Sequence, residues 1–452
     1  MHILKGYTKQ EISWMMYDWA NSAHSVIIVT LLPIFFDTVA GYTADSVSSM
    51  STWGYATSIA MLIVALAAPF LGVFGDIRGM RKKLFSFFML LGVAACAGMA
   101  FTPGMDFTSG PVAAGKVATL ILVLYIVSVI GFDASAIYYD AFLTDVTIED
   151  RMDKVSTMGY GLGYIGGSTI PLLIFLIMNL VGVPMLTCLA FVFGLTAVWW
   201  LAFSLPLLKN CEQTSGKPYE KGDVARSIKG VGTTIKEIIA NKPMLIYILS
   251  YFFYIDGVHT VISMATTYGT NLGLDSTGMM LALLLVQILG LTFCLLYIKC
   301  SEKFGARTMV GFGICVYMFI CIFAFFMNSL WQFWVLAVLC ATSQGGIQAL
   351  SRSMYGKLIP DKDRSGEFFG FFDIFGKFSS IMGPALVGVV SSVVANGMLG
   401  AKGLTAQTAT AEQIDAINAQ SSHYGILSII IIIIVGAVLY FGFLPKAEHA
   451  KQ

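Results

Sequence analysis

The sequence has 452 residues, of which 57% are hydrophobic and only 12% are charged. Soluble domains contain roughly 45 to 50% apolar and about 25% charged residues, so this composition excludes an ordinary water-soluble globular protein. The net charge of +1 gives no indication of a nucleic-acid partner.

Twelve apolar stretches are each long enough to cross a membrane as a helix, which takes about 20 mostly apolar residues. They are too long for the strands of a membrane barrel, and open sheet edges do not occur in hydrocarbon, so helices are predicted. The predicted spans are residues 13–36, 47–74, 83–101, 117–143, 156–180, 185–207, 244–267, 276–298, 308–327, 330–356, 367–395 and 423–444. The sequence therefore predicts an all-α integral membrane protein with twelve transmembrane helices.

Lysine and arginine are distributed unevenly between the loops. Arg352 and Lys377 fall inside predicted spans, and Lys116 and Lys402 follow odd-numbered spans. The others lie in the two termini and in the loops after even-numbered spans, so both termini are predicted to be cytoplasmic. The first residues lack the pattern of a cleaved signal peptide, and we expect a multi-pass protein of the plasma membrane.

The longest connection between predicted spans is residues 209–242, which carry charges of both signs. This linker divides the chain into residues 1–208 and 243–452, with six spans on each side. Two six-helix bundles are therefore predicted. Within the linker, residues 224–240 mix Ile and Val with Arg and Lys, which fits either an amphipathic helix on the inner membrane face or a solvated tether.

A motif follows the second span, with the sequence Gly-Val-Phe-Gly-Asp-Ile-Arg-Gly-Met-Arg-Lys-Lys at residues 72–83. In this motif Gly72 permits close helix approach, Gly79 permits a tight turn, and Asp76 can accept hydrogen bonds while the basic cluster is expected to stay in water. A shorter copy without the first glycine follows the eighth span, at residues 302–307. The motif resembles the loop signature of the major facilitator superfamily. This resemblance implies two bundles around a central path lined by the first, fourth, seventh and tenth helices.

Further motifs are scattered along the whole chain. They are Tyr-Asp-Trp-Ala-Asn-Ser-Ala at 17–23, the glycine-rich segment 159–167, Tyr-Ile-Asp-Gly-Val at 254–258, Gln-Ala-Leu-Ser-Arg-Ser at 348–353, and Glu-Phe-Phe-Gly at 367–370 leading to Gly-Pro at 383–384. Together they resemble the vacuole-effluxer-like branch of that superfamily, which includes the autophagy-related vacuolar amino-acid exporter of fungi. The chain departs from this branch at His24 and Asp140. Both departures add an ionisable group, so the substrate need not be the usual one of the family.

The segment 159–167 also satisfies Gly-x-Gly-x-x-Gly, the fingerprint of dinucleotide binding. That fingerprint requires a preceding strand, whereas this segment lies within a predicted membrane helix. The four-residue spacing of Gly159, Gly163 and Gly167 predicts instead a smooth face on which another helix packs closely. No nucleotide, metal or other cofactor is expected.

Ionisable residues within the spans indicate where function lies, because a charge at the bilayer centre costs roughly 2.5 to 3.5 kcal/mol. Asp133, Asp256 and His259 are the candidate proton carriers. The predicted solute-binding residues are Tyr17, Asn21, His24, Asp133, Asp256, His259, Gln344 and Gln348. His24 and His259 occupy equivalent places in the two repeats and are expected to face each other. For each histidine and for Asp133, a hydrogen-bonded packing role is the open alternative.

A second group of charged residues lies near the predicted cytoplasmic ends of the helices. It comprises Asp18, Asp76, Arg81, Asp140, Arg352, Asp373 and Lys377. Asp373 and Lys377 are four residues apart and can pair within one helix. Arg352 is placed to reach Asp18 or Asp140. Such pairs bias two conformations when they form and break, so a cytoplasmic gate is predicted. The alternative is that Arg352 and Lys377 snorkel to the membrane interface.

By resemblance, the expected function is secondary transport of a small polar solute, most simply an amino acid or a related zwitterion, by alternating access. The nucleotide-binding pattern Gly-x-x-x-x-Gly-Lys-Ser/Thr is absent from the sequence, so a gradient is the expected driving force. Protons are the expected coupling ion, and efflux is the direction expected beside the family resemblance. The expected partners are the solute, protons and membrane lipid, with no nucleic acid, and the chain is expected to act as a monomer and not as an enzyme. Two alternatives from other classes are a lipid or glycolipid flippase of the same fold and a nutrient sensor that does not transport.

Overall fold

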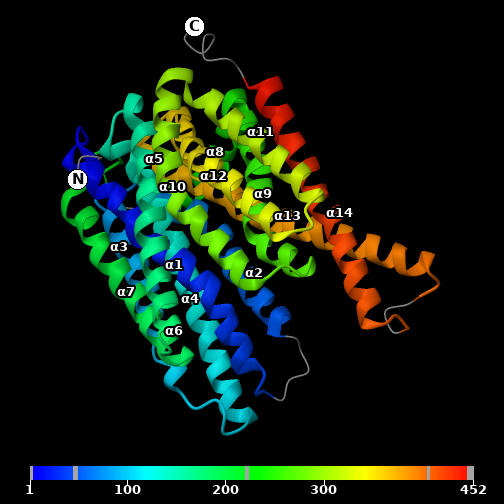
Figure 1. The fold of residues 1–452 in the computed structure, drawn as a ribbon. Helices are drawn as coiled ribbons and strands as arrows, with labels where there is room; N and C mark the ends of the chain where they lie inside the picture. The colour runs from blue at the N-terminus through cyan, green and yellow to red at the C-terminus, as the bar shows by residue number, and fades with distance from the viewer. Residues whose placement is uncertain (1–3, 44–48, 219–222, 405–407, 445–452) are drawn as a thin grey trace. The chain divides into compact units, whose positions relative to one another are not determined.

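The computed structural model describes residues 4–43, 49–218, 223–404 and 408–444, and helices make up most of them (Figure 1). Within these residues, twelve helices are long and apolar enough to cross a membrane. The predicted all-α membrane fold is therefore confirmed. The cytoplasmic position of the two termini stays a prediction.

The first six spans are formed by α1 (Lys9–Ala40), α2 (Ser49–Gly75), α3 (Arg81–Met99), α4 (Pro111–Val146), the pair α5 (Met152–Gly163) and α6 (Ile170–Leu180), and α7 (Met185–Asn210). The last six are formed by α9 (Lys242–Asn271), α10 (Ser276–Phe304), α11 (Ala306–Phe325), α12 (Leu330–Leu358), α13 (Ser365–Ala401) and α14 (Ala411–Val438), which continues as a π-helical turn (Leu439–Phe443). Single 3-10 turns occur at Thr102–Gly104, Glu149–Arg151 and Lys362–Arg364.

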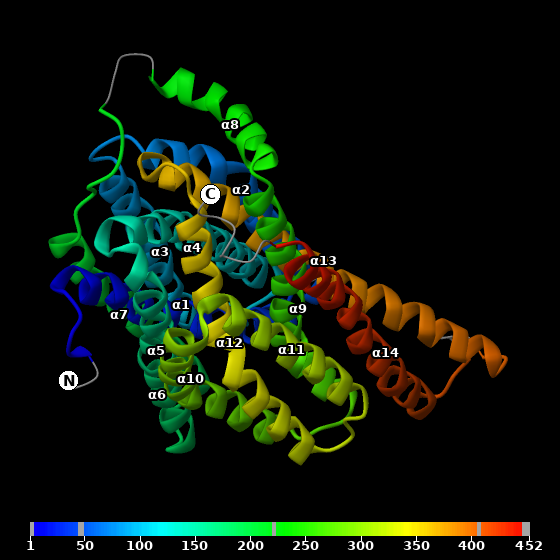
Figure 2. The same ribbon diagram turned by 90° about the horizontal axis from the view of Figure 1, so that it is seen from above.

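Between the sixth and seventh spans, the linker contains the helix α8 (Asp223–Ala240), visible in Figure 2. Its second half has two different faces, because Thr234 and Ile238 are buried whereas Ile235 and Ile239 are exposed. The linker is therefore helical over Asp223–Ala240, as the amphipathic-helix alternative requires. Its position on the inner membrane face stays a prediction.

The chain divides into two compact units. Unit 1 comprises Met1–Thr234 together with Gly356–Ile374, and unit 2 comprises Ile235–Tyr355 together with Phe375–Gln452. α13 therefore contributes its first residues to unit 1 and the rest to unit 2. The domain boundaries expected at residues 209–242 stay a prediction.

In unit 1, α1 packs against α4, α5 and α7. A Cβ atom added to Gly159 would lie 2.3 Å from Asp18 Oδ2, and one added to Gly163 would lie 3.1 Å from the Asp18 carbonyl oxygen. A Cβ on Gly167 would lie 2.5 Å from the Trp19 carbonyl oxygen. All three glycines thus face α1, which confirms the predicted packing stripe.

The fifth span differs from the single helix predicted over residues 156–180. It is interrupted by a π-helical turn (Tyr164–Thr169) between α5 and α6. At this turn the indole ring of Trp19 lies against Gly166, where an added Cβ would be 2.1 Å from a ring atom. The interruption therefore coincides with the place where a large side chain of α1 fills the space beside the helix.

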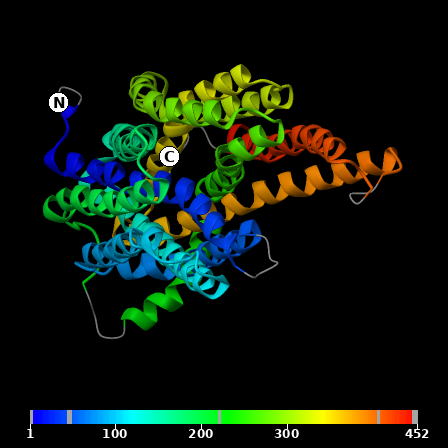
Figure 3. The ribbon, with the colours of Figure 1, turned by 60° about the horizontal axis from the view of Figure 1, so that its bottom comes forward.

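In unit 2, α9 packs along α14, and α14 packs along α11 (Figure 3). The hydroxyl group of Ser250 donates a hydrogen bond to the Gly436 carbonyl oxygen at 2.8 Å. A Cβ on Gly436 would lie 2.7 Å from the backbone nitrogen of Tyr254, so α9 and α14 approach closely at this glycine.

Candidate functional site

The predicted polar stripe of α1 faces α4. The hydroxyl oxygen of Tyr17 lies 2.7 Å from Ser135 Oγ, and Nε2 of His24 lies 3.2 Å from Ser128 Oγ. The His24 side chain is 1% exposed and stacks on Phe132, with ring centroids 4.7 Å apart. This enclosure is typical of a packing residue, which is the alternative that the sequence left open for His24.

The other predicted site residues of unit 1 are also inside the helix bundle. Asn21 is 8% exposed on α1, and Asp133 is 2% exposed on α4. Asp133 interacts electrostatically with Tyr125 on the same helix. Asp140, seven residues after Asp133 and on the same helix, is only half-buried. Asp133 is therefore the more deeply enclosed of the two carboxyl groups on α4.

Asp76 and Arg81 meet at the end of α2, whereas the sequence led us to expect that the basic residues of the motif stay in water. The Arg81 side chain is fully buried, and its Nη2 atom lies 2.9 Å from Asp76 Oδ1. Its Nη1 atom lies 2.5 Å from Asp145 Oδ2 on α4, and Nη2 also donates to Ser365 Oγ at 2.9 Å. We call Asp76, Arg81, Asp145 and the backbone of residues 365–367 the Asp76–Arg81 cluster. Sequence reasoning missed Asp145, because no local pattern marks it.

Asp76 caps the first turn of α13. Its Oδ1 atom accepts the backbone N–H of Gly366 at 2.7 Å, and Oδ2 accepts that of Glu367 at 2.8 Å. These N–H groups have no partner inside their own helix, and a carboxylate is the favoured capping group. Burial raises the pKa of Asp76 to about 7, although the charge of Arg81 opposes this rise. A Cβ on Gly72 would lie 2.2 Å from the Gly366 carbonyl oxygen, so this glycine lets α2 reach α13.

The remaining predicted gate residues are divided between the units. In unit 1, Asp18 is 8% exposed and accepts a 2.7 Å hydrogen bond from the Tyr139 hydroxyl group, and Asp373 is half-buried. In unit 2, Arg352 is 4% exposed and Lys377 is half-buried. Pairing of these residues across the two units stays a prediction.

The best-defined ionisable group of unit 2 is the carboxyl group of Asp256 on α9, which is fully buried. Its Oδ1 atom accepts the backbone N–H of Gly383 on α13 at 2.9 Å. Its Oδ2 atom accepts no hydrogen bond of normal geometry from a described residue, although the nearby Thr260 hydroxyl group interacts with the carboxyl group. Gly383 precedes Pro384, which has no N–H group and disturbs the hydrogen-bond ladder of a helix. A Cβ on Gly383 would lie 1.8 Å from Thr260 Oγ1, so only glycine fits between α9 and α13 here.

Next to Asp256, His259 interacts with the Gln348 side chain of α12 and with the charge of Lys377. The structure thus brings together three residues that the sequence singled out. Two residues before Asp256, the Tyr254 hydroxyl group lies 2.6 Å from Ser351 Oγ. This second link between α9 and α12 was missed, because Tyr and Ser carry no signal of pairing over such a separation in sequence.

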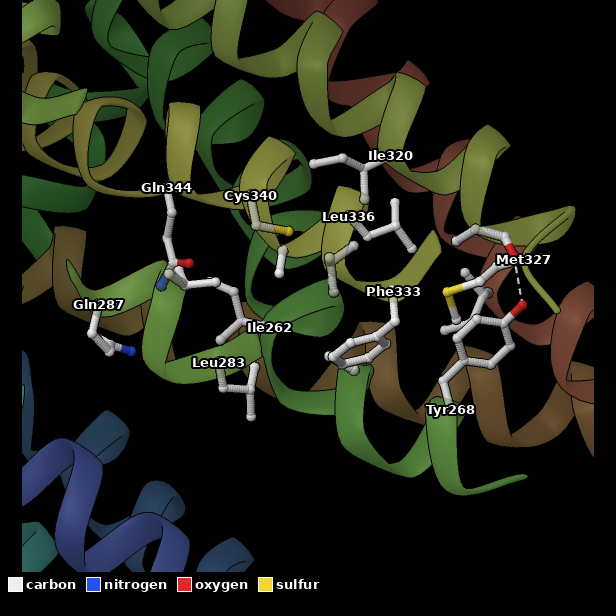
Figure 4. A pocket seen from close by; sticks show the side chains of 16 residues that line it. Ile262, Tyr268, Leu283, Gln287, Ile320, Met327, Phe333, Leu336, Cys340 and Gln344 are labelled. Carbon is white, nitrogen blue, oxygen red and sulfur yellow. Dashed lines mark hydrogen bonds between the residues drawn. The ribbon is translucent and has the colours of Figure 1, made fainter. Parts of the chain in front are cut away.

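A cavity of about 90 Å³ lies between α9, α10, α11, α12 and α14. Figure 4 shows Gln344 and Gln287 at one end of it and Tyr268 and Met327 at the other. The Tyr268 hydroxyl group already has two partners, because it donates to the Ala324 carbonyl oxygen at 2.5 Å and lies 2.6 Å from Nδ1 of His423. Apart from these few polar groups, the lining is apolar. The cavity therefore offers an apolar space with amide groups at one end.

A family model described as "Vacuole effluxer Atg22 like" matches residues 7–397. The chain belongs to this family. The Atg22-like chain is 40% identical to the "Uncharacterized MFS-type transporter YxiO" of Bacillus subtilis, over 98% of this chain and 96% of that protein. It is 25% identical to "Autophagy-related protein 22-1" of Penicillium rubens over 55% of this chain. That match covers 46% of the fungal protein, so it spans about half of that relative's length.

Among solved structures, the proton:xylose symporter XylE of the major facilitator superfamily superposes on this Atg22-like chain with a TM-score of 0.70. The match covers 97% of this chain and 95% of XylE at 13% sequence identity, so it concerns the fold alone. Together with the family assignment, it makes the Atg22-like chain a multi-pass transporter of the major facilitator superfamily and not an enzyme.

Proposed function

We propose that this Atg22-like protein is a proton-coupled carrier that exports an amino acid or a related zwitterion from the cytoplasm by alternating access. The proposal rests on the surroundings of the Asp256 carboxyl group. Its buried carboxyl group accepts the Gly383 N–H group and interacts with the Thr260 hydroxyl group, and both of these partners are neutral. A carboxyl group in such a place takes up and releases a proton when its surroundings change, which is what coupling requires.

The groups around Asp256 suit a zwitterion. Gln344 and Gln348 of α12 carry side-chain amides, which donate and accept hydrogen bonds and so match both an ammonium and a carboxylate group. His259 interacts with Gln348, and Gln344 lines the apolar cavity. We assign the polar part of the solute to this group of residues and an apolar part to the cavity. Export follows the description of the family as effluxers.

In the same proposal, the Asp76–Arg81 cluster is the closed form of a cytoplasmic gate. The fully buried Arg81 is held by two carboxylates, and Asp76 caps α13, so opening must separate α13 from α2. The gate also includes Asp18, Asp140, Arg352, Asp373 and Lys377. Asp133 is a second candidate for the proton path. We place the protein in the plasma membrane as a monomer with both termini in the cytoplasm.

The test is transport by purified protein in proteoliposomes with an imposed pH gradient, using pooled labelled amino acids. One pH unit supports about tenfold accumulation when one proton accompanies each solute molecule. Asp256→Asn should abolish accumulation driven by the gradient but retain exchange of labelled for unlabelled solute, because the amide cannot release a proton. Asp150→Asn makes the same change at an exposed carboxyl group outside this site and should behave as the wild type.

Each other outcome has a definite meaning. Gradient-driven accumulation by Asp256→Asn at the wild-type level would remove Asp256 from the coupling mechanism. Saturable binding of an amino acid without any flux would indicate a sensor. If the wild-type protein neither binds nor moves any amino acid, the proposed solute class is wrong.

A further inference from the structure

Residues 211–217, which follow α7, lie across the Asp76–Arg81 cluster; we call this segment the clasp. Its Gln213 side chain bridges the end of α2 and the start of α3. Oε1 of Gln213 accepts the backbone N–H groups of Gly79 at 2.9 Å and of Arg81 at 3.2 Å. Nε2 of the same side chain donates to the Gly75 carbonyl oxygen at 3.0 Å. One side chain therefore fixes both ends of the loop that carries Asp76 and Arg81.

The backbone of the clasp also pairs with this loop. The Arg78 N–H group donates to the Lys217 carbonyl oxygen at 2.9 Å, and the Lys217 N–H group donates to the Asp76 carbonyl oxygen at 3.0 Å. Gly216, which precedes Lys217, has a φ of +113°, a backbone conformation that residues with a side chain rarely adopt. A Cβ at Gly216 would also lie 2.6 Å from the Asp76 carbonyl oxygen. The clasp is therefore fitted to the loop and is not a solvated tether.

The clasp also reaches Arg81, its partner Asp145 and the segment that leads into α13. Ser215 Oγ accepts a hydrogen bond from Arg81 Nη1 at 3.2 Å, and the Ser215 N–H group donates to Asp145 Oδ1 at 2.9 Å. The Gly216 N–H group donates to Asp363 at 2.8 Å, two residues before α13 begins. The same short segment thus contacts the guanidinium group, its carboxylate partner and the chain that enters α13.

We propose that the clasp holds the Asp76–Arg81 cluster in its closed form and that Gln213 is a positioning residue for transport. This inference rests on the proposed role of the cluster as a gate. Without Gln213, the loop between α2 and α3 loses three hydrogen bonds, so Asp76 and Arg81 are no longer held where they cap α13 and pair. Opening of the gate then requires release of the clasp, because Gly216 ties the clasp to Asp363. The first part of the linker between the two halves of the chain, residues 211–217, therefore belongs to the gate.

Cys211, the first residue of the clasp, is a built-in reporter of its release. It is fully buried, and its thiol group lies 3.5 Å from the Gln10 carbonyl oxygen. Burial raises the pKa of the Cys211 thiol to about 12, and the thiolate is the form that reacts with alkylating reagents. Cys211 is therefore protected from alkylation while the clasp is in place, and its thiol group becomes reactive when the clasp is released.

The experiment measures alkylation rates by maleimide in the full-length protein, with the labelled peptide identified by mass spectrometry. Gln213→Leu should raise the rate at Cys211 at least about tenfold, because three hydrogen bonds are lost. A reporter in the gate itself, Ser365→Cys, should become reactive together with Cys211. Gln213→Glu keeps the acceptor for both N–H groups and should restore most of the protection. Glu212→Gln changes the exposed neighbouring residue and is the matched control, for which no effect is expected.

Unchanged protection of Cys211 in Gln213→Leu would overturn the proposal. The proposal would also be overturned if Cys211 became reactive while the Ser365→Cys reporter stayed protected, because release of the clasp would then not open the gate. If Gln213→Leu does not fold, Gln213→Asn supplies the test, since its shorter amide cannot bridge both ends of the loop. In transport, Gln213→Leu should change the turnover rate and leave the half-saturation concentration unchanged. Failure of the wild type to move any amino acid would contradict the proposed solute, whereas the alkylation result would still decide the role of the clasp.

Discussion

The contact between α2 and the first turn of α13 is tested by the substitution Gly72→Ala. A Cβ at this position would lie 2.2 Å from the carbonyl oxygen of Gly366 and 2.8 Å from its carbonyl carbon. An ordinary contact of this kind begins at 3.4 Å. Both obstructing atoms belong to the backbone and cannot rotate away, so the two helices must separate by roughly 1 Å to restore normal contact distances.

This separation breaks the cap on α13. Asp76 accepts the N–H groups of Gly366 and Glu367 at 2.7 and 2.8 Å, and a shift of about 1 Å takes both bonds beyond normal hydrogen-bond length. Each bond contributes about 1 to 3 kcal/mol, so the closed form loses about 2 to 6 kcal/mol relative to a form in which α13 has moved away. A change of about 5.5 kcal/mol inverts a 99:1 population, so the upper half of this range changes the resting state.

The assay is the alkylation rate of the Ser365→Cys reporter in the presence of Gly72→Ala. Ser365 is fully buried, and we expect its cysteine replacement to react at least about thirtyfold faster when the cap is lost, which corresponds to about 2 kcal/mol. The matched control is Gly54→Ala on the same helix, where an added Cβ meets no atom within 4 Å. Equal rates in the two variants would refute the claim that close approach at Gly72 maintains the gate.

Three further predictions concern the cavity, the gate and the core of unit 1. Ala337→Phe should fill the apolar cavity and raise the half-saturation concentration of bulky solutes at least about tenfold in competition assays, whereas Val338→Phe, at an exposed neighbouring position, should not. Burial raises the pKa of Asp76 from 3.8 to about 7 in the closed gate, so the closed form binds a proton more tightly than a form in which Asp76 is in water, even though Arg81 opposes this rise. Protonation therefore favours the closed form fully below about pH 4, and this stabilisation is lost as the pH rises through 7. Alkylation at Ser365→Cys, corrected for thiol ionisation, should increase over this interval and become independent of pH in Asp76→Asn. His24→Ala should lower the free energy of unfolding by about 2 to 4 kcal/mol, which would be measured as a lower melting temperature. Unchanged stability together with lost proton coupling would instead show that His24 acts in solute transport.

The features that follow from local sequence could be predicted. Long apolar segments predict membrane helices, since backbone N–H and C=O groups in lipid must form their hydrogen bonds within each segment. The four-residue glycine spacing at residues 159–167 specified the face of α5 and of the turn after it that packs on α1.

The features that depend on tertiary contacts could not be predicted. Asp145 and Gln213 lie far from Arg81 in sequence, and an isolated Asp or Gln carries no signal of the group that it will contact. The same limit applies to His24, because the pattern on α1 predicts a polar stripe but does not say whether the stripe faces a solute path or α4. The structure shows that residues 224–240 are helical, and their place on the inner membrane face stays a prediction.

One consequence of α13 is mechanical. The helix has 37 residues, and its first turn is tied to Asp76 while the Gly383 N–H group is tied to Asp256. Gly366 and Gly383 are separated by about 26 Å of helix at 1.5 Å per residue. A continuous helix acts as a stiff rod, with weak points where its ladder is disturbed, here near Pro384. A single helix therefore carries both ties, one to Asp76 in unit 1 and one to Asp256 in unit 2.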